Sequence, residues 1–310
     1  MTIQVAAAQV RPRKADYQAN LEMLGDLFEQ LAESTTPTDL LTLPETILSG
    51  YFLEGGVRDV ARPADAVFED ILAVFRSRCV DPEAVLDVSL GFYEEYRGQY
   101  YNAALYATLT GSDHAACAAR LHHVHRKFFL PTYGVFDEQR HVTRGRTITA
   151  FDTRLGRQAL LICEDAWHSV SAALAALQGA RIIHILSASP GTDFHGPTPG
   201  NLACWDRILQ GIAVEHGVFV VYAGLVGFEG GKGFTGSSCI VDPWGKQLVA
   251  APLLGPALVR AEIEADDVTI ARTSMPLLSD LESALGDIAA HFHALAAREG
   301  PEEPRGRSDA

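Results

Sequence analysis

Short apolar runs and longer segments with a helical repeat follow one another along most of the chain. Segments with an apolar residue every three or four positions are typical of amphipathic helices and occupy residues 16–33, 66–78, 170–178 and 202–216. Apolar runs of strand length occupy residues 3–10, 40–43, 85–92, 102–110, 148–151, 158–162, 181–187, 218–223 and 257–263. A further strand is expected before Arg126, and a hairpin around Pro243-Trp244-Gly245. Strands that alternate with helices predict an α/β fold in which helices cover sheets.

The pattern changes after residue 275. A capping box at residues 279–282 predicts the start of a helix that ends before Gly300-Pro301. Its apolar side chains form one stripe, at Leu281, Leu285, Ile288, Phe292 and Leu295. We therefore expect one domain over residues 1–275, followed over 276–310 by a C-terminal helix and a polar tail. The stripe is expected to contact another subunit of a homodimer or larger homo-oligomer, with docking on its own domain as the alternative.

The composition argues against several classes of protein. The chain has 310 residues, of which 47% are hydrophobic, and this is enough for a sizeable core. Its net charge of −14 argues against nucleic acid and anionic membranes as partners. Residues 1–10 lack the features of a signal peptide, and no apolar run is long enough to span a bilayer. The five scattered cysteines form no C-x-x-C pair, so we expect free thiols in the cytoplasm.

Cys163 is the candidate nucleophile. The apolar run 159–162 ends at this cysteine, Glu164 and Asp165 follow, and a helical pattern then begins. A nucleophile on a strand-to-helix turn is exposed at the edge of a sheet, where the next backbone N–H can point at an oxyanion. A cysteine in such a stretch can also be a small packing residue, so other reactive groups must support the assignment.

Two more charged residues lie at the ends of predicted strands. Glu45 follows Pro44 and could be a general base, or else a helix cap or a surface acid. Lys127 precedes the apolar residues 128–131. A lysine next to such a surface is either partly buried and paired with an anion, or extends its ammonium group to solvent. With Cys163 they complete a mechanism in which a thiolate attacks a carbonyl carbon, a carboxylate takes the proton and a cation stabilises the oxyanion.

Three blocks of the sequence resemble the signature blocks of the nitrilase superfamily of carbon–nitrogen hydrolases. They are residues 43–45 (LPE), 125–131 (HRKFFLP) and 163–167 (CEDAW), in the same order and with fitting spacing. Downstream blocks at 234–238 and 241–245 extend the match over residues 3 to about 275. The resemblance implies a four-layer α-β-β-α sandwich that pairs with a second copy. It also implies a catalytic set of Cys163 as nucleophile, Glu45 as base, Lys127 as oxyanion stabiliser and Glu138 as a second glutamate that orients lysine and substrate.

Within the superfamily, the sequence most resembles the glutaminase domain of glutamine-dependent NAD synthetases. True nitrilases typically carry Cys-Trp-Glu at the nucleophile, whereas this chain has CED at 163–165. The resemblance implies that Tyr133 and Ser189 contact substrate, with Glu164 and Trp167 beside the nucleophile. It places His195 where the glutaminases have a basic residue for glutamine, a departure that indicates altered specificity. No synthetase half is present, so ammonia would be released unless a partner chain receives it.

Metal and cofactor sites are not expected. Only His123 and His125 of the cluster that includes His122 would share a strand face, and no acidic pair completes a site. Residues 230–233 (GGKG) lack the Ser or Thr and the helix that a phosphate loop needs, and are read as a turn. A papain-type enzyme would need a histidine paired with Cys163, and nothing marks one.

The sequence therefore predicts an amidase that converts a small primary amide, which could be glutamine-like, to a carboxylate and ammonia through a thioester. The alternatives are a hydrolase of N-carbamoyl compounds or nitriles on the same residues, and a non-catalytic binding scaffold. Because Glu45, Lys127 and Cys163 are all intact, the scaffold is disfavoured.

Overall fold

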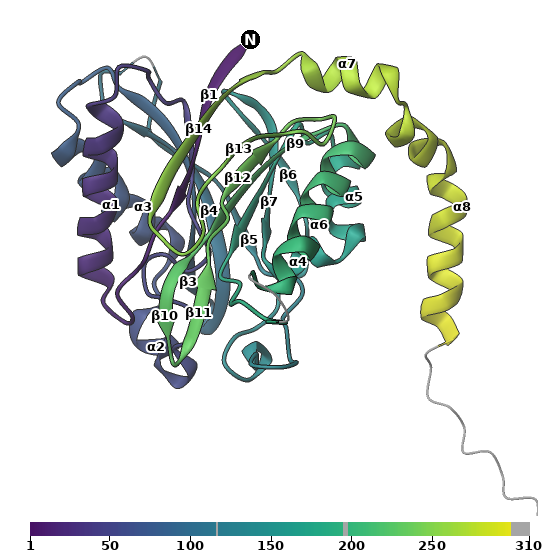
Figure 1. Cartoon of the computed structure of the whole chain (residues 1–310), viewed down its shortest axis with the longest axis horizontal. Helices are drawn as coiled ribbons and strands as arrows, with labels where there is room; N and C mark the ends of the chain where they lie inside the picture. The colour runs from purple at the N-terminus through teal and green to yellow at the C-terminus, as the bar shows by residue number, and fades with distance from the viewer. Residues whose placement is uncertain (116, 195–197, 299–310) are drawn as a thin grey trace, which may run out of the picture.

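The structure is a computed structural model that describes residues 1–115, 117–194 and 198–298, and within these residues two six-stranded mixed sheets form the centre (Figure 1). The first sheet has the order β14-β1-β2-β3-β4-β5, from β1 (Thr2–Gln9), β2 (Leu40–Thr42), β3 (Val85–Tyr96), β4 (Gln99–Thr110), β5 (Arg120–Arg126) and β14 (Ala257–Glu264). The second has the order β13-β12-β9-β8-β7-β6, from β6 (Ala150–Thr153), β7 (Gly156–Ile162), β8 (Ile182–Ser187), β9 (Phe219–Gly224), β12 (Cys239–Val241) and β13 (Gln247–Ala250).

Helices cover the outer faces of both sheets, which gives the expected four-layer α-β-β-α sandwich. Helices α1 (Tyr17–Ala32) and α3 (Ala64–Arg78) lie on the first sheet, and α4 (Glu164–Trp167), α5 (Ser169–Leu177) and α6 (Gly200–His216) lie on the second (Figure 1). Each long helix formed where the apolar repeat predicts it. Asp16 caps α1 by accepting a hydrogen bond from the backbone N–H of Ala19 at 3.1 Å.

Strand β1 shows how one short apolar run serves two cores. Because successive side chains of a strand point to opposite faces, Val5 and Ala7 join the core between the sheets, while Ala6 and Ala8 join the core under α1 and α3. Both faces of β1 are therefore buried, which explains why its sequence is apolar without alternation.

The structure adds elements that the sequence pattern did not predict. Strands β10 (Val226–Glu229) and β11 (Lys232–Thr235) form a separate hairpin, whose turn consists of residues 230–231 of the predicted turn at 230–233, while residues 232–233 begin β11. Helices α2 (Val57–Val60) and α7 (Asp267–Ser274) are also additional, as is a 3₁₀ turn, η1 (Glu54–Gly56). A second 3₁₀ turn, η2 (Glu138–Arg140), lies in the segment between β5 and β6 and carries Glu138.

The predicted C-terminal helix is present as α8 (Leu277–Arg298). It contacts α5 and α6, and Figure 1 shows it running away from the sandwich. Much of its stripe is uncovered: Leu285, Phe292 and Leu295 are 44%, 61% and 56% exposed. Residues 299–310, which include the predicted polar tail, lie outside the described residues. Among those described, no helix combines the length and the apolar character needed to cross a bilayer.

Candidate active site

The structure brings the predicted reactive residues together from both sheets. Glu45 follows β2 and Lys127 follows β5, so both extend from the first sheet. Cys163 follows β7 of the second sheet, and Glu138 enters from η2. All four side chains are buried, with Glu45 and Lys127 fully inaccessible to solvent. Packing of one sheet on the other therefore assembles the site.

Lys127 lies between two carboxylates. Its Nζ donates to Glu45 Oε1 and to Glu138 Oε1, each at 2.8 Å. Burial alone would lower the pKa of Lys127, but the negative charges of Glu138 and Glu45 outweigh it and raise this pKa well above its usual value. Burial raises the pKa of Glu138, with Lys127 opposing the rise. Lys127 is thus a permanent, fully buried cation.

Glu45 also joins the two sheets. Its Oε2 accepts a hydrogen bond from the backbone N–H of Ala188, directly after β8, at 2.7 Å. Its Oε1 faces Lys127 and the side chain of Asn102, whose Nδ2 lies 2.7 Å away. Three donors therefore hold the carboxylate in one orientation between the lysine and the second sheet.

Cys163 occupies a strained turn. Its φ of 45° and ψ of −97° are unusual for a residue with a side chain, as expected for a nucleophile between a strand and a helix. The Ser187 hydroxyl donates to its Sγ at 3.5 Å. Burial raises the pKa of the Cys163 thiol far above its usual value, and the Glu45 charge adds to the rise while Lys127 opposes it. The resting thiol is protonated, so it needs a base before it can attack.

Asp165 organises the turn around the nucleophile, a function that the sequence did not reveal. Its fully buried carboxylate accepts hydrogen bonds from the backbone N–H groups of Phe128, Phe129 and Ile162 at 2.9–3.0 Å. It also accepts from His125 Nε2 at 2.7 Å. These contacts tie the segment after Lys127 to the strand that ends at Cys163. The sequence signal that could have indicated this function is an acidic residue directly after the apolar run and the nucleophile. A carboxylate in such a stretch is expected to be buried and to need hydrogen-bond donors.

The residues predicted to bind substrate surround the same turn. The Tyr133 hydroxyl donates to Glu164 Oε2 at 2.9 Å. Ser189 Oγ accepts from Trp205 Nε1 at 3.1 Å, and the Trp205 ring meets Trp167 edge-on, with 5.2 Å between ring centroids. His195 lies outside the described residues, so its predicted role stays a prediction.

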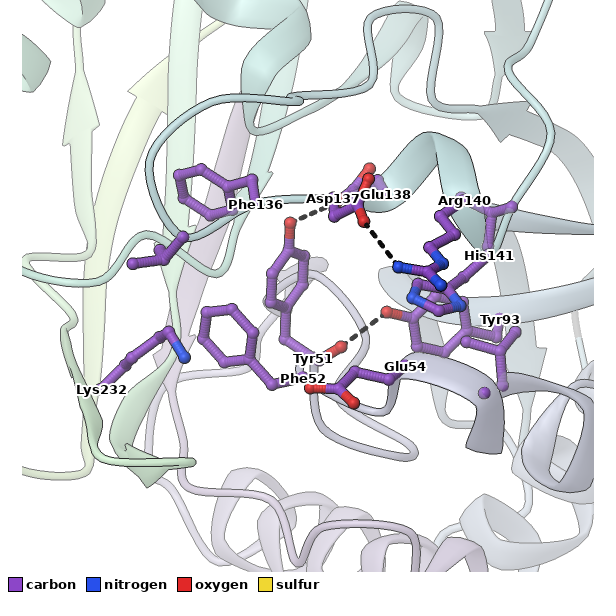
Figure 2. A pocket seen from close by; sticks show the side chains of 14 residues that line it. Tyr51, Phe52, Glu54, Tyr93, Phe136, Asp137, Glu138, Arg140, His141 and Lys232 are labelled. Atoms are coloured by element: carbon purple, nitrogen blue, oxygen red, sulfur yellow. Dashed lines mark hydrogen bonds and ion pairs between the residues drawn. The ribbon is translucent and has the colours of Figure 1, made fainter.

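A pocket of about 460 Å³ lies beside Glu138, and Figure 2 shows its lining. Tyr51 and Phe136 form part of its wall, and Tyr51 donates a hydrogen bond from its hydroxyl to Glu138 Oε1. Charged side chains of both signs also line it, among them Glu54, Arg140 and Lys232. Tyr51 could not be predicted from the sequence, because its nearness to Glu138 depends on tertiary packing.

The three histidines near Lys127 point to different partners. His122 Nε2 lies 2.8 Å from Thr108 Oγ1, His123 stacks on Phe151 and His125 pairs with Asp165. Within the described ranges, no cluster of three or more His, Cys, Asp or Glu side chains is placed to hold a metal ion.

Comparison with known proteins covers nearly the whole chain. The carbon–nitrogen hydrolase family model matches residues 4–273. A probable nitrilase from Schizosaccharomyces pombe is 25% identical over 86% of this chain and 90% of its own length. An (R)-stereoselective amidase from a Pseudomonas species is 29% identical, over 90% and 91% of the two chains.

Other relatives are longer. The glutamine-dependent NAD(+) synthetase of Thermotoga maritima is 27% identical over 86% of this chain but only 42% of its own length. The chain thus spans less than half of that enzyme. Among solved structures, a carbon–nitrogen hydrolase from Helicobacter pylori G27 superposes with a TM-score of 0.77 over 92% of this chain and 98% of its own, at 23% identity.

Proposed function

The chain belongs to the carbon–nitrogen hydrolase family, and we propose that it is an amidase that hydrolyses a small primary amide to a carboxylate and ammonia. One observation carries this proposal: the buried Cys163 thiol shares the site with a fully buried glutamate–lysine ion pair, and both charges act on its pKa. Such a set supplies a nucleophile, a base and a cation without a histidine. The curated relatives named as an amidase and a nitrilase support the same reaction class.

In the proposed mechanism, Glu45 removes the proton from Cys163 Sγ and the thiolate attacks the amide carbon. Lys127 and the backbone N–H of Glu164 stabilise the oxygen as it becomes negative. The C–N bond then breaks, and Glu45 returns the proton to the departing ammonia, which leaves a thioester on Cys163. Glu45 next takes a proton from water, whose oxygen attacks the thioester. Release of the carboxylate restores the thiol, so no cofactor is consumed.

The substrate is proposed to be an amide rather than a nitrile because Glu164 and Asp165 follow the nucleophile, as in the glutaminase branch. Glutamine is one member of this class. N-carbamoyl compounds and nitriles remain the alternatives on the same residues. We also propose a cytoplasmic location, from the odd number of scattered cysteines, and release of ammonia to solvent or to a partner chain.

Ammonia release from a panel of amides, nitriles and N-carbamoyl compounds tests this proposal. We expect at least one primary amide to be the best substrate and Cys163→Ala to lose activity while it keeps its fold. Cys239→Ala is the matched control, since Cys239 is another buried cysteine, in β12. A nitrile turned over faster than every amide would overturn the amide assignment, and an active Cys163→Ala would overturn the mechanism.

A further inference from the structure

Asn102 is a fully buried polar residue of β4 that touches both carboxylates of the site. Its Nδ2 lies 2.7 Å from Glu45 Oε1 and 3.3 Å from Glu138 Oε1. Its backbone C=O accepts a hydrogen bond from the N–H of Lys127 at 2.8 Å. One residue thus contacts Glu45, Glu138 and Lys127.

The four polar groups form a closed ring. Lys127 Nζ and Asn102 Nδ2 each donate to both Glu45 Oε1 and Glu138 Oε1, and each of these oxygens accepts from both donors. Two carboxylate oxygens held this close repel each other, and Lys127 brings one positive charge for the pair. Asn102 adds N–H donors without adding charge, and an aspartate of the same shape would instead add a third carboxylate.

The orientation of the Asn102 amide follows from its neighbours. Because ionised carboxylates only accept, the amide nitrogen must face them, and this leaves Oδ1 on the other side. Among the described residues, Oδ1 is buried and has no hydrogen-bond partner. An unpaired buried acceptor disfavours folding, so packing alone does not explain an asparagine at this position.

We propose that Asn102 is a positioning residue that holds Glu45 and Glu138 on Lys127 and saturates Oε1 of Glu45. With Oε1 occupied by two donors, Oε2 is the oxygen left to receive the thiol proton. Oε2 is also the oxygen bonded to Ala188 N–H, and Ala188 follows the serine that contacts Cys163 Sγ. The inference rests on the proposed function, because it assigns a supporting residue to the base of that reaction.

The test measures how the alkylation rate of Cys163 depends on pH, and it needs no known substrate. Iodoacetamide alkylates Cys163 at a rate set by transfer of its proton, and peptide mass spectrometry follows this cysteine separately from the other four. In Asn102→Leu and Asn102→Ala, both carboxylates lose the N–H donor that Asn102 supplies to their ionised forms. We expect the acidic limb of the rate–pH profile to move up by about one pH unit, which is about a tenfold slower alkylation on that limb.

Asn20→Leu is the matched control. Asn20 is also a fully buried asparagine, and its side chain forms two hydrogen bonds with the backbone of Arg13, on the far side of the first sheet. Its loss should lower stability without shifting the rate–pH profile of Cys163 alkylation. A wild-type profile in both Asn102 variants, beside slow alkylation in Glu45→Gln, would overturn the role of Asn102 alone. Wild-type alkylation in Glu45→Gln would instead overturn the proposed base, and with it the role of Asn102.

Discussion

The side chains that hold Cys163 and Lys127 in place act through backbone groups. Asp165 receives three backbone N–H bonds from two segments that are distant in sequence, and His125 satisfies what remains of its carboxylate. Since the Asp165 carboxylate is fully buried, its removal would leave these N–H groups without an acceptor. The distance between nucleophile and lysine therefore depends on a residue that takes no part in the proposed reaction.

We expect Asp165→Asn to lower the free energy of unfolding by about 1–3 kcal/mol, the cost of an unpaired buried group. Either carboxylate oxygen faces a backbone N–H, so an amide NH₂ in either place meets a donor instead of an acceptor. Urea unfolding of wild type and variant measures the change. Asp16→Asn is the control, because aspartate and asparagine cap helices equally well. Equal midpoints for wild type and Asp165→Asn would contradict this account.

The strand-end residues of the site could be predicted from the sequence, and their supporting residues could not. Glu45, Lys127 and Cys163 each lie where a predicted strand ends and next to apolar residues, and a charged or nucleophilic residue there is conspicuous. Asn102 opens a run that reads simply as a strand, and Tyr51 lies in a turn without a pattern. Their partners come from other segments, so only tertiary packing shows what they contact.

At the scale of elements, strand β3 supports the segment that carries Glu45. Gly91 of β3 lies directly under this segment, and its N–H donates to the carbonyl of Pro44 at 3.0 Å. A Cβ at Gly91 would lie 2.5 Å from Glu45 Cα, closer than any side chain tolerates. The strand therefore needs a glycine here for space rather than for an unusual backbone angle.

Gly91→Ala should displace Glu45 and slow amide hydrolysis by about 100-fold, because a misplacement of about 1 Å can cost that much. The loss should appear in the alkylation of Cys163 as well. Gly211→Ala is the control: no atom beyond the local backbone lies within 4 Å of the added Cβ, and alanine at this exposed helix position should stabilise by roughly 0.5–1 kcal/mol. A fully active Gly91→Ala would show that the segment can shift without harm.

The β10–β11 hairpin holds the segment with Tyr51 through one carboxylate. Glu229 Oε2 accepts from the N–H groups of Tyr51 and Phe52 at 2.9 and 3.0 Å. Burial raises the pKa of Glu229 above 4.5, and the two N–H groups oppose the rise. The folded protein thus binds this proton more tightly than the unfolded chain, so stability falls as pH rises from about 4.5 through the folded pKa.

Glu229→Gln should therefore be more stable than wild type at pH 7 and about equal to it near pH 4, because an amide oxygen keeps both hydrogen bonds and carries no buried charge. Thermal unfolding between pH 4 and 8 measures the difference. Glu229→Ala is the control: it does not titrate at this position either, and its two unpaired N–H groups should make it about 1–3 kcal/mol less stable than Glu229→Gln at every pH. A difference between Gln variant and wild type that does not change with pH would contradict the raised pKa.

The main strands and helices could be predicted within a few residues because each helix carries an apolar repeat and each main strand a short apolar run. The β10–β11 hairpin could not, since its strands have four residues each and contain glycine. The order of strands in each sheet could not be predicted either. No local sequence pattern indicates that β14 pairs with β1, about 250 residues away. The hydrophobic pattern predicts which helices and strands form, whereas the pairing of strands depends on the fold of the whole chain.

At the scale of the molecule, the two sheets each contribute part of the site, and α8 extends beyond them. We propose that α8 contacts a second copy, because burying a large apolar side chain stabilises by roughly 1.5–3 kcal/mol and the stripe leaves several exposed. Docking on its own domain is the alternative. The contacts of α8 with α5 and α6 would place the second copy near the helices that follow Cys163.

Truncation after Pro276 should lower the mass measured by light scattering from that of a dimer or larger assembly. Leu285→Ser with Phe292→Ser in the full chain keeps the helix and should have the same effect, which separates the stripe from the rest of α8. Ser283→Ala, an exposed position of the same helix outside the stripe, is the control. Unchanged mass and stability in the truncated and double variants would refute a role of α8 in assembly.

The pairing of β1 with β14 also has a consequence for how the protein is made. Thr2 pairs with Glu264 and Gln9 with Ala257, so β1 leaves the ribosome about 250 residues before the strand that pairs with it. Until residue 264 emerges, one edge of β1 is open, and the second sheet likewise lacks β12 and β13 until residue 250. Neither sheet can be completed before these late strands are made. We therefore expect Cys163 to reach its place beside Glu45 only after residues up to 264 have been translated. A nascent chain stalled before residue 239 would carry Cys163 without the complete sheet that places it beside Glu45.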